Sequence, residues 1–141
     1  MKKNFALMCA AFFSLVMLSS CKKEDGDMLL LPEETPPVIA LNTTAESFSY
    51  SIAAKNYTKQ EVYNLQVAAD SIRISYATSS ITNGQMEVLV ELKDGTKLVS
   101  RNLSGVLAAN DYKKIKSPLS KVTLTYSNFT GQFALSLNTA L

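Results

Sequence analysis

The chain has 141 residues, a length that suits one domain, and its 14 basic side chains nearly balance its 12 acidic ones. This balance gives no electrostatic attraction to nucleic acid, so we expect no nucleic-acid partner. Histidine is absent, which removes the commonest general base and the commonest metal ligand at neutral pH. We therefore expect no enzyme activity, no metal and no other cofactor.

Residues 1–20 have the layout of a secretory signal peptide. Met1–Asn4 is a short positive segment, and Phe5 to Leu18 is a run of about 14 mostly apolar residues, which is short for a membrane span. An uncleaved transmembrane anchor is the alternative interpretation. Since Cys9 lies inside this leader, the remaining chain holds Cys21 alone and has no cysteine pair for a disulfide.

The quartet Leu18-Ser19-Ser20-Cys21 resembles the lipobox of bacterial lipoprotein precursors. In that family the cysteine thiol receives diacylglycerol, the leader is cleaved just before it, and the new amine is acylated. The resemblance implies that Cys21 is a lipidation site and that the membrane is a partner through this anchor. Two or three acyl chains give stable anchoring, whereas a single chain is marginal.

The segment after the cysteine, residues 22–27, has a lysine pair followed by acidic residues. It resembles the surface-export signal of Bacteroidota lipoproteins. This resemblance implies a lipid-anchored protein of the outer membrane that faces the cell exterior. The inward, periplasmic orientation remains the alternative.

Residues 21–39 are predicted to be the lipidated cysteine and a flexible tether, followed by one domain over residues 40–141. The tether carries five acidic residues and three prolines, and the pair Pro36-Pro37 favours an extended spacer. Its apolar run, residues 28–31, either folds back on the membrane or the domain, or is simply flexible.

The domain has an apolar period of two, which is typical of half-buried β-strands. Residues 62–69 and 98–103 add two weaker segments, for about seven strands in all. The count and spacing predict an all-β fold, a single antiparallel β-sandwich of the immunoglobulin-like or jelly-roll kind. The alternating apolar sets are Phe48, Tyr50 and Ile52; Ile72, Ile74 and Tyr76; Met86, Val88, Val90 and Leu92; Val122, Leu124 and Tyr126; and Phe133, Leu135 and Leu137.

Turn residues predict two hairpins. A two-residue type I′ loop at Asp94-Gly95 would set Val90 opposite Val99 and Met86 opposite Leu103; a bulged three-residue loop that pairs Leu92 with Leu98 is the alternative. A four-residue loop over residues 128–131 would set the last two apolar sets against each other, with Tyr126 opposite Phe133. Residues 105–118 follow neither the two-residue period of strands nor the 3.6-residue period of helices, and we expect them to form a long loop.

The whole pattern resembles small Bacteroidota outer-membrane lipoproteins of unassigned function, which implies a compartment and an architecture but no ligand. We expect a non-catalytic domain that binds a protein or glycan partner. The alternative is a structural or accessory subunit of an outer-membrane assembly for transport or fimbriae, joined through an exposed sheet edge.

A basic cluster is the first candidate contact surface. It consists of Lys113, Lys114, Lys116 and Lys121 with Tyr112 as the nearby aromatic, and it could meet anionic lipid, lipopolysaccharide or acidic glycan; a solvated loop is the alternative. Tyr57, Tyr63 and Tyr112 could stack on sugar rings, or the tyrosines could instead belong to the core.

The triplet Asp70-Ser71-Ile72 resembles the O-glycosylation sequon of Bacteroidota, which implies Ser71 as a modification site. Asp94 and Asp111 have no carboxylate companion at a metal-binding or catalytic spacing, so we expect both to form turns.

Overall fold

The computed structural model describes residues 35–140, which form six β-strands and their connections. Within these residues there is no helix, and so none that could span a membrane. The predicted all-β fold is confirmed. The strands are β1 (Val38–Thr43), β2 (Ser47–Val67), β3 (Ser71–Leu92), β4 (Lys97–Leu103), β5 (Leu107–Lys114) and β6 (Leu119–Thr139).

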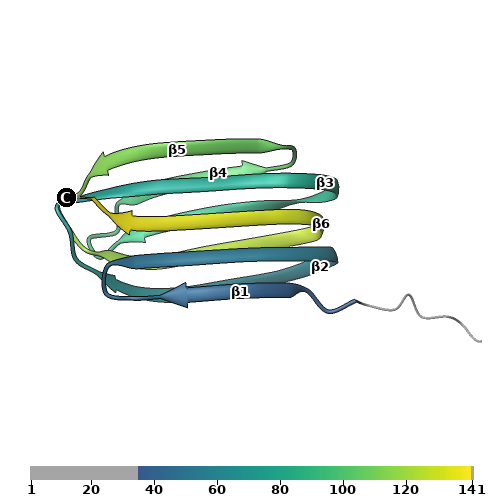
Figure 1. Ribbon diagram of the computed structural model, residues 1–141, viewed down its shortest axis with the longest axis horizontal. Coiled ribbons are helices and arrows are strands. Elements are labelled where there is room, and N and C mark those ends of the chain that lie inside the picture. Colours follow the sequence, from purple (N-terminus) through teal and green to yellow (C-terminus); the bar gives the residue numbers. More distant parts are fainter. Residues whose placement is uncertain (1–34, 141) are drawn as a thin grey trace, which may run out of the picture. The chain divides into compact units, whose positions relative to one another are not determined.

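All six strands belong to one antiparallel sheet, in the order β1-β2-β6-β3-β4 with β5 also paired to β3. The three long strands, β2, β3 and β6, turn over at one end and run back behind themselves (Figure 1). The sheet is thereby folded into two layers, which gives the predicted antiparallel sandwich with six strands instead of about seven.

We call the two layers the front sheet and the back sheet. The front sheet has β1, β5 and the halves of the long strands over residues 47–54, 71–79 and 131–139. The back sheet has β4 and the other halves, over residues 59–67, 85–92 and 119–126.

Each long strand changes sheets at a bend where the register of its pairing shifts. The bends carry residues with positive φ: Asn56 at 52°, Ser80 at 54° and Asn128 at 49°. Asparagine tolerates this conformation better than most residues. Gly84 (φ 71°) is required at its bend, because a Cβ atom there would lie 2.3 Å from the carbonyl oxygen of Asn128.

The core lies between the two sheets, because alternate side chains of every long strand point inward. The inward set agrees with the apolar period of the sequence. From the front sheet it contains Phe48, Tyr50, Ile52, Ile72, Ile74, Phe133, Leu135 and Leu137, and from the back sheet Leu65, Val67, Met86, Val88, Val90, Leu92, Val99, Leu103, Leu119, Val122, Leu124 and Tyr126.

The predicted final hairpin, with a loop at residues 128–131, is wrong. Tyr126 pairs with Met86 in the back sheet, whereas Phe133 pairs with Ile52 in the front sheet. The two halves of β6 therefore belong to different sheets and are not neighbours in one ladder. Both arrangements let apolar side chains meet apolar side chains, so the period of two does not distinguish them.

The hairpin between β3 and β4 keeps the predicted pairs of Val90 with Val99 and of Met86 with Leu103. Its predicted type I′ loop is wrong. The Leu92 N–H donates to the Thr96 carbonyl over 2.9 Å, and among residues 93–95 only Gly95 has a positive φ, of 86°. This is a three-residue loop, in which a single glycine supplies the left-handed conformation.

A bulge restores the register after that loop. Glu91 pairs with Lys97 while Val90 pairs with Val99, so Leu98 is the extra residue. The alternative pairing of Leu92 with Leu98 is therefore also wrong, although its three-residue loop is present.

The long loop predicted for residues 105–118 is wrong in its central part. Residues Leu107–Lys114 form β5, which pairs with Ser71–Thr78 of β3 at the border of the front sheet. None of its side chains is fully buried, so apolar and polar residues do not alternate along this strand. A two-residue apolar period therefore does not identify such an edge strand.

Candidate functional site

The middle of the outer face of the front sheet is built from small, uncharged side chains, and Arg73 lies on the same face toward one end. On this face each strand alternates with the apolar core positions, so serine, alanine and asparagine point outward. The register aligns them in rows across five strands. One row is Asn42, Ser49, Ser136, Ser75 and Asn110, and the next is Ala40, Ser51, Ala134, Ala77 and Ala108.

These two rows border an open pocket of about 680 Å³, which we call the front-face pocket. Three consecutive residues from each of the five strands of the front sheet line it, and none of these residues is charged. The lining is Ala40, Leu41, Asn42, Ser49, Tyr50, Ser51, Ser75, Tyr76, Ala77, Ala108, Ala109, Asn110, Ala134, Leu135 and Ser136.

The polar groups of the pocket are only partly engaged with one another. Ser75 donates to Asn110 Oδ1 over 3.2 Å, and Asn138 donates to Ser136 Oγ over 2.7 Å. Asn42 and Ser49, at the β1 side, form no side-chain hydrogen bond with any described residue. Hydroxyl and amide groups that remain exposed can both donate to and accept from a ligand.

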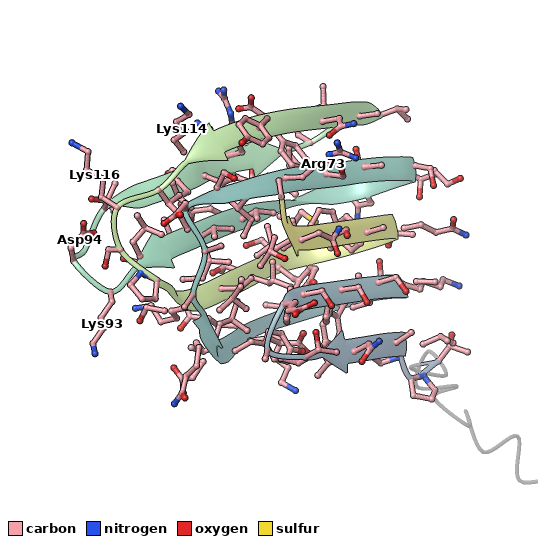
Figure 2. All side chains as sticks on the ribbon, turned by 60° about the vertical axis from the view of Figure 1, so that its left-hand side comes forward. Arg73, Lys93, Asp94, Lys114 and Lys116 are labelled. Carbon is pink, nitrogen blue, oxygen red and sulfur yellow. The ribbon has the colours of Figure 1, made fainter. Side chains whose placement is uncertain are left out.

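The basic cluster lies outside this pocket. Tyr112, Lys113 and Lys114 end β5, and Lys116 follows in the next connection. Figure 2 shows Lys114 and Lys116, with Asp94, at the end of the domain away from the bends. The structure thus places these four residues at one end of the domain, where Tyr112 is half exposed.

The lysines of this region differ in their partners. Lys113 lies 3.6 Å from Asp111 and Lys121 lies 2.9 Å from Glu91, whereas Lys114 and Lys116 form no ion pair within residues 35–140. Arg73 pairs across the ladder with Tyr112. The positive charge at this border is therefore partly neutralised and solvated.

Ser71 is buried in the folded domain. Its hydroxyl donates to the Ala140 carbonyl over 2.7 Å. Asp94 is a turn residue, because its carboxylate accepts from the Thr96 N–H over 2.9 Å. This hydrogen bond lowers the pKa of Asp94. Asp111 instead lies in β5, so its predicted turn is wrong.

A cluster of tyrosine hydroxyls surrounds one buried carboxylate, and we call it the tyrosine–glutamate cluster. Tyr50 and Tyr63 donate to Glu61 Oε2 over 2.7 and 3.0 Å, and Tyr57 donates to Glu61 Oε1 over 2.9 Å. Tyr126 donates to the Tyr50 hydroxyl over 3.0 Å. The cluster joins the front sheet to the back sheet, and Glu61 is only 8% exposed.

The environment shifts the pKa values of this cluster. Burial opposes ionisation of Glu61, but the three tyrosine donors and Lys59, 3.7 Å away, outweigh it and lower its pKa. Burial and the hydrogen bond to Glu61 raise the pKa of Tyr57 and of Tyr63 to about 12. The pKa of Tyr50 is raised as well, first by burial. The stable state has an ionised carboxylate and neutral phenols.

Both oxygens of Glu61 accept hydrogen bonds from donors of the protein itself, so the cluster has a structural role. Tyr57 and Tyr63 pack against the core, which agrees with the second of their two sequence-based interpretations.

Sequence reasoning missed both Glu61 and the front-face pocket, although each left a signal. Glu61 shares the odd-numbered parity of the inward residues Leu65 and Val67. The signal for the pocket is that the outward residues of β2, β3, β5 and β6 are small and uncharged where they line it.

The lipidation site Cys21, the export-like segment and most of the tether lie outside the described residues. Among residues 35–140 no group of three or more acidic, cysteine or histidine side chains is placed to hold a metal ion.

No family model and no curated protein matches the chain. In structure the chain is similar to a protein from Bacillus endospore appendages, which form disulfide-linked pili, with a TM-score of 0.45 and 13% identity over 77% of this chain and 93% of that chain.

It is also similar to two carbohydrate-binding modules. One is the C-terminal CBM6 module of LamC, a marine laminarinase from Zobellia galactanivorans, with a TM-score of 0.40 and 12% identity over 75% of this chain and 93% of that chain. The other is TmCBM61, solved in complex with β-1,4-galactotriose, with a TM-score of 0.37 and 13% identity over 75% of this chain and 88% of that chain. These likenesses concern the course of the strands alone.

Proposed function

We propose that this chain is a lipid-anchored, non-catalytic binding module whose front-face pocket holds a neutral glycan chain. The observation that carries the proposal is the lining of the pocket. Five strands contribute to it without a single charged side chain, and the charged Arg73 of the same face lies one row beyond it.

The chemistry of the lining suits a hydroxyl-rich ligand without charge. Serine hydroxyls and asparagine amides match the donors and acceptors of sugar hydroxyls. The methyl groups of Ala77, Ala108 and Ala134 offer apolar contacts to the C–H faces of sugar rings. An anionic ligand is less well matched, because the lining of the pocket supplies no cation to compensate for its desolvation.

The dimensions of the pocket favour a chain over a single sugar. Neighbouring strands lie about 4.8 Å apart, so the row from Asn42 on β1 to Asn110 on β5 spans about 19 Å. That length accommodates several linked sugar units. A peptide in extended form would instead seek a free sheet edge, where its backbone groups find partners.

The anchor completes the proposal. We infer that Cys21 carries the acyl chains and that the domain faces the cell exterior from the outer membrane, supported by the lipobox-like quartet and the acidic segment behind it. The chain between Cys21 and β1 can extend on the order of 50 Å. A binding domain on such a tether can sample polymers beyond the immediate lipid surface.

The pocket is tested with the detergent-extracted chain in native gels that contain neutral polysaccharides, namely β-glucan, xylan or mannan, or an acidic one, alginate. We expect retardation by at least one neutral polymer and none by alginate. Ala134→Trp fills the centre of the pocket and should abolish retardation, whereas Thr123→Trp, on the outer face of the back sheet, should retain it. Retardation by alginate alone, by no polymer, or equally in both variants would overturn the proposal.

The anchor is tested separately by labelling cells with radioactive palmitate. Cys21→Ser should lose the label. Cys9→Ser should keep the label, because Cys9 lies in the leader that is cleaved off. Label that persists in Cys21→Ser would refute the anchor. Protease added to intact cells should degrade the domain; protection until lysis would refute the outward orientation.

A further inference from the structure

Strand β1 is an unusually exposed edge. All six of its residues are exposed, with Val38 at 73% and Leu41 at 49%. Its other side pairs with β2, but its outer side has no neighbouring strand within the described part of the chain. Its backbone groups on that side are therefore available to another strand.

The other sheet edges carry charges that discourage pairing, whereas β1 carries none. The edge strand β5 has Asp111, Lys113 and Lys114, and β4 has Lys97 and Arg101. Native proteins use such charges to prevent strands from pairing with other molecules. The sequence Val-Ile-Ala-Leu-Asn-Thr of β1 has neither a charge nor a proline.

The apolar side chains of β1 also lack a facing layer. Leu41 pairs with the buried Tyr50, and Ile39 pairs with the buried Ile52, so both point toward the back sheet. In the front sheet β1 lies beyond β2, whereas within residues 35–140 the back sheet has no strand beyond β2. Ile39 and Leu41 consequently stay 39% and 49% exposed.

We propose that β1 pairs with β1 of a second copy of this chain, antiparallel, with Leu41 opposite Leu41 of that copy. In this register the side chains that point toward the back sheet lie on the same face in both copies, and Ile39 of one copy lies opposite Thr43 of the other. On the outward face Ala40 of one copy lies opposite Asn42 of the other. Each pair fits sterically, and the two front sheets merge into one sheet of ten strands.

The absence of charge favours a second copy as the occupant. Self-pairing of β4 or β5 would bring lysines and arginines of two chains together, whereas β1 brings together only leucine, β-branched and small residues. The pairing would also join the two front-face pockets along one continuous surface. It does not depend on which ligand the pocket takes.

The test is disulfide trapping of the full chain in the cells that produce it. Leu41→Cys should give a dimer that disappears on reduction, because opposite residues of an antiparallel pair lie about 5 Å apart. Ile39→Cys is the matched control on the same face of the same strand. In the proposed register the two copies of residue 39 lie about 14 Å apart. This variant should therefore give no more dimer than the parent chain, which already holds Cys9 and Cys21.

A double variant with Ile39→Cys and Thr43→Cys should restore the trapped dimer. Equal trapping of Leu41→Cys and Ile39→Cys would show random collision and would overturn the proposal, as would no trapping at Leu41→Cys in protein that reaches parental levels.

A charge exchange tests the same contact without cysteine. A tagged Leu41→Lys chain should no longer co-purify an untagged Leu41→Lys chain, while it should recover an untagged Leu41→Glu chain. Loss of co-purification in both combinations, or its persistence in both, would contradict the pairing.

Discussion

The hydroxyl of Tyr50 in the front sheet donates a hydrogen bond of 2.7 Å to Glu61 in the back sheet, although both residues belong to strand β2. Only the bend between them makes this contact possible. Tyr63 reinforces it, because its ring packs against Tyr50 with 5.5 Å between the ring centres. The contact therefore holds the folded-over strand closed.

Replacing Glu61 with leucine should destabilise the domain by about 2–4 kcal/mol, because several tyrosine hydroxyls lose their acceptor inside the sandwich. The free energy of unfolding is measured by urea denaturation followed by circular dichroism. Glu87→Leu, on the exposed outer face of β3, is the control and should change it by no more than about 0.5 kcal/mol. Equal losses in both variants would show that the cluster contributes nothing special.

Stability should decline at both ends of the pH range. The contribution of Glu61 is present above the ordinary glutamate pKa and is lost as the pH falls through its lowered pKa. The contributions of Tyr57 and Tyr63 are present below the ordinary tyrosine pKa of about 10 and are lost as the pH rises toward about 12. Thermal unfolding from pH 2 to pH 12 gives both limbs. Glu61→Gln should flatten the acid limb, and an unchanged acid limb would assign it to other carboxylates.

Asn110→Ala should weaken the binding of a neutral polysaccharide about 3- to 10-fold, because it removes one polar contact at the β5 border of the pocket. Affinity is measured by isothermal titration with the polymer that retards the parent chain. Asn64→Ala, an exposed amide on the back sheet, should leave the affinity unchanged. An effect of Asn64→Ala as large as that of Asn110→Ala would move the binding surface off the front sheet.

Gly84→Ala should destabilise the domain by at least about 2 kcal/mol, since its positive φ disfavours alanine and its Cβ would collide with the backbone of Asn128. The backbone of β3 at Gly84 lies close to the backbone of β6 at Asn128. Gly105→Ala meets nothing within 4 Å and is the control, with an expected change within about 0.5 kcal/mol. A tolerated Gly84→Ala would mean that the two bends can separate without cost.

The alternation along the chain is enough to identify most side chains of the core, although not Glu61 or Phe129. Alternation at Phe48, Tyr50 and Ile52, and again at Val122, Leu124 and Tyr126, identifies the inward face of a strand regardless of its neighbours. The predicted pairs of Val90 with Val99 and of Met86 with Leu103 hold, because the bulge at Leu98 offsets the extra residue of the loop. The leader and Cys21 are likewise interpreted from local patterns alone.

The neighbours of each strand are known only from the folded domain. A period of two reports that one side is buried, but it does not say whether the next segment pairs at the edge or folds over into the opposite sheet, as β6 does at Asn128. It also passes over β5, which buries no side chain fully. The neutral pocket and the ring of tyrosines around Glu61 arise from segments far apart along the chain, so their chemistry exists only once the sheet has folded onto itself.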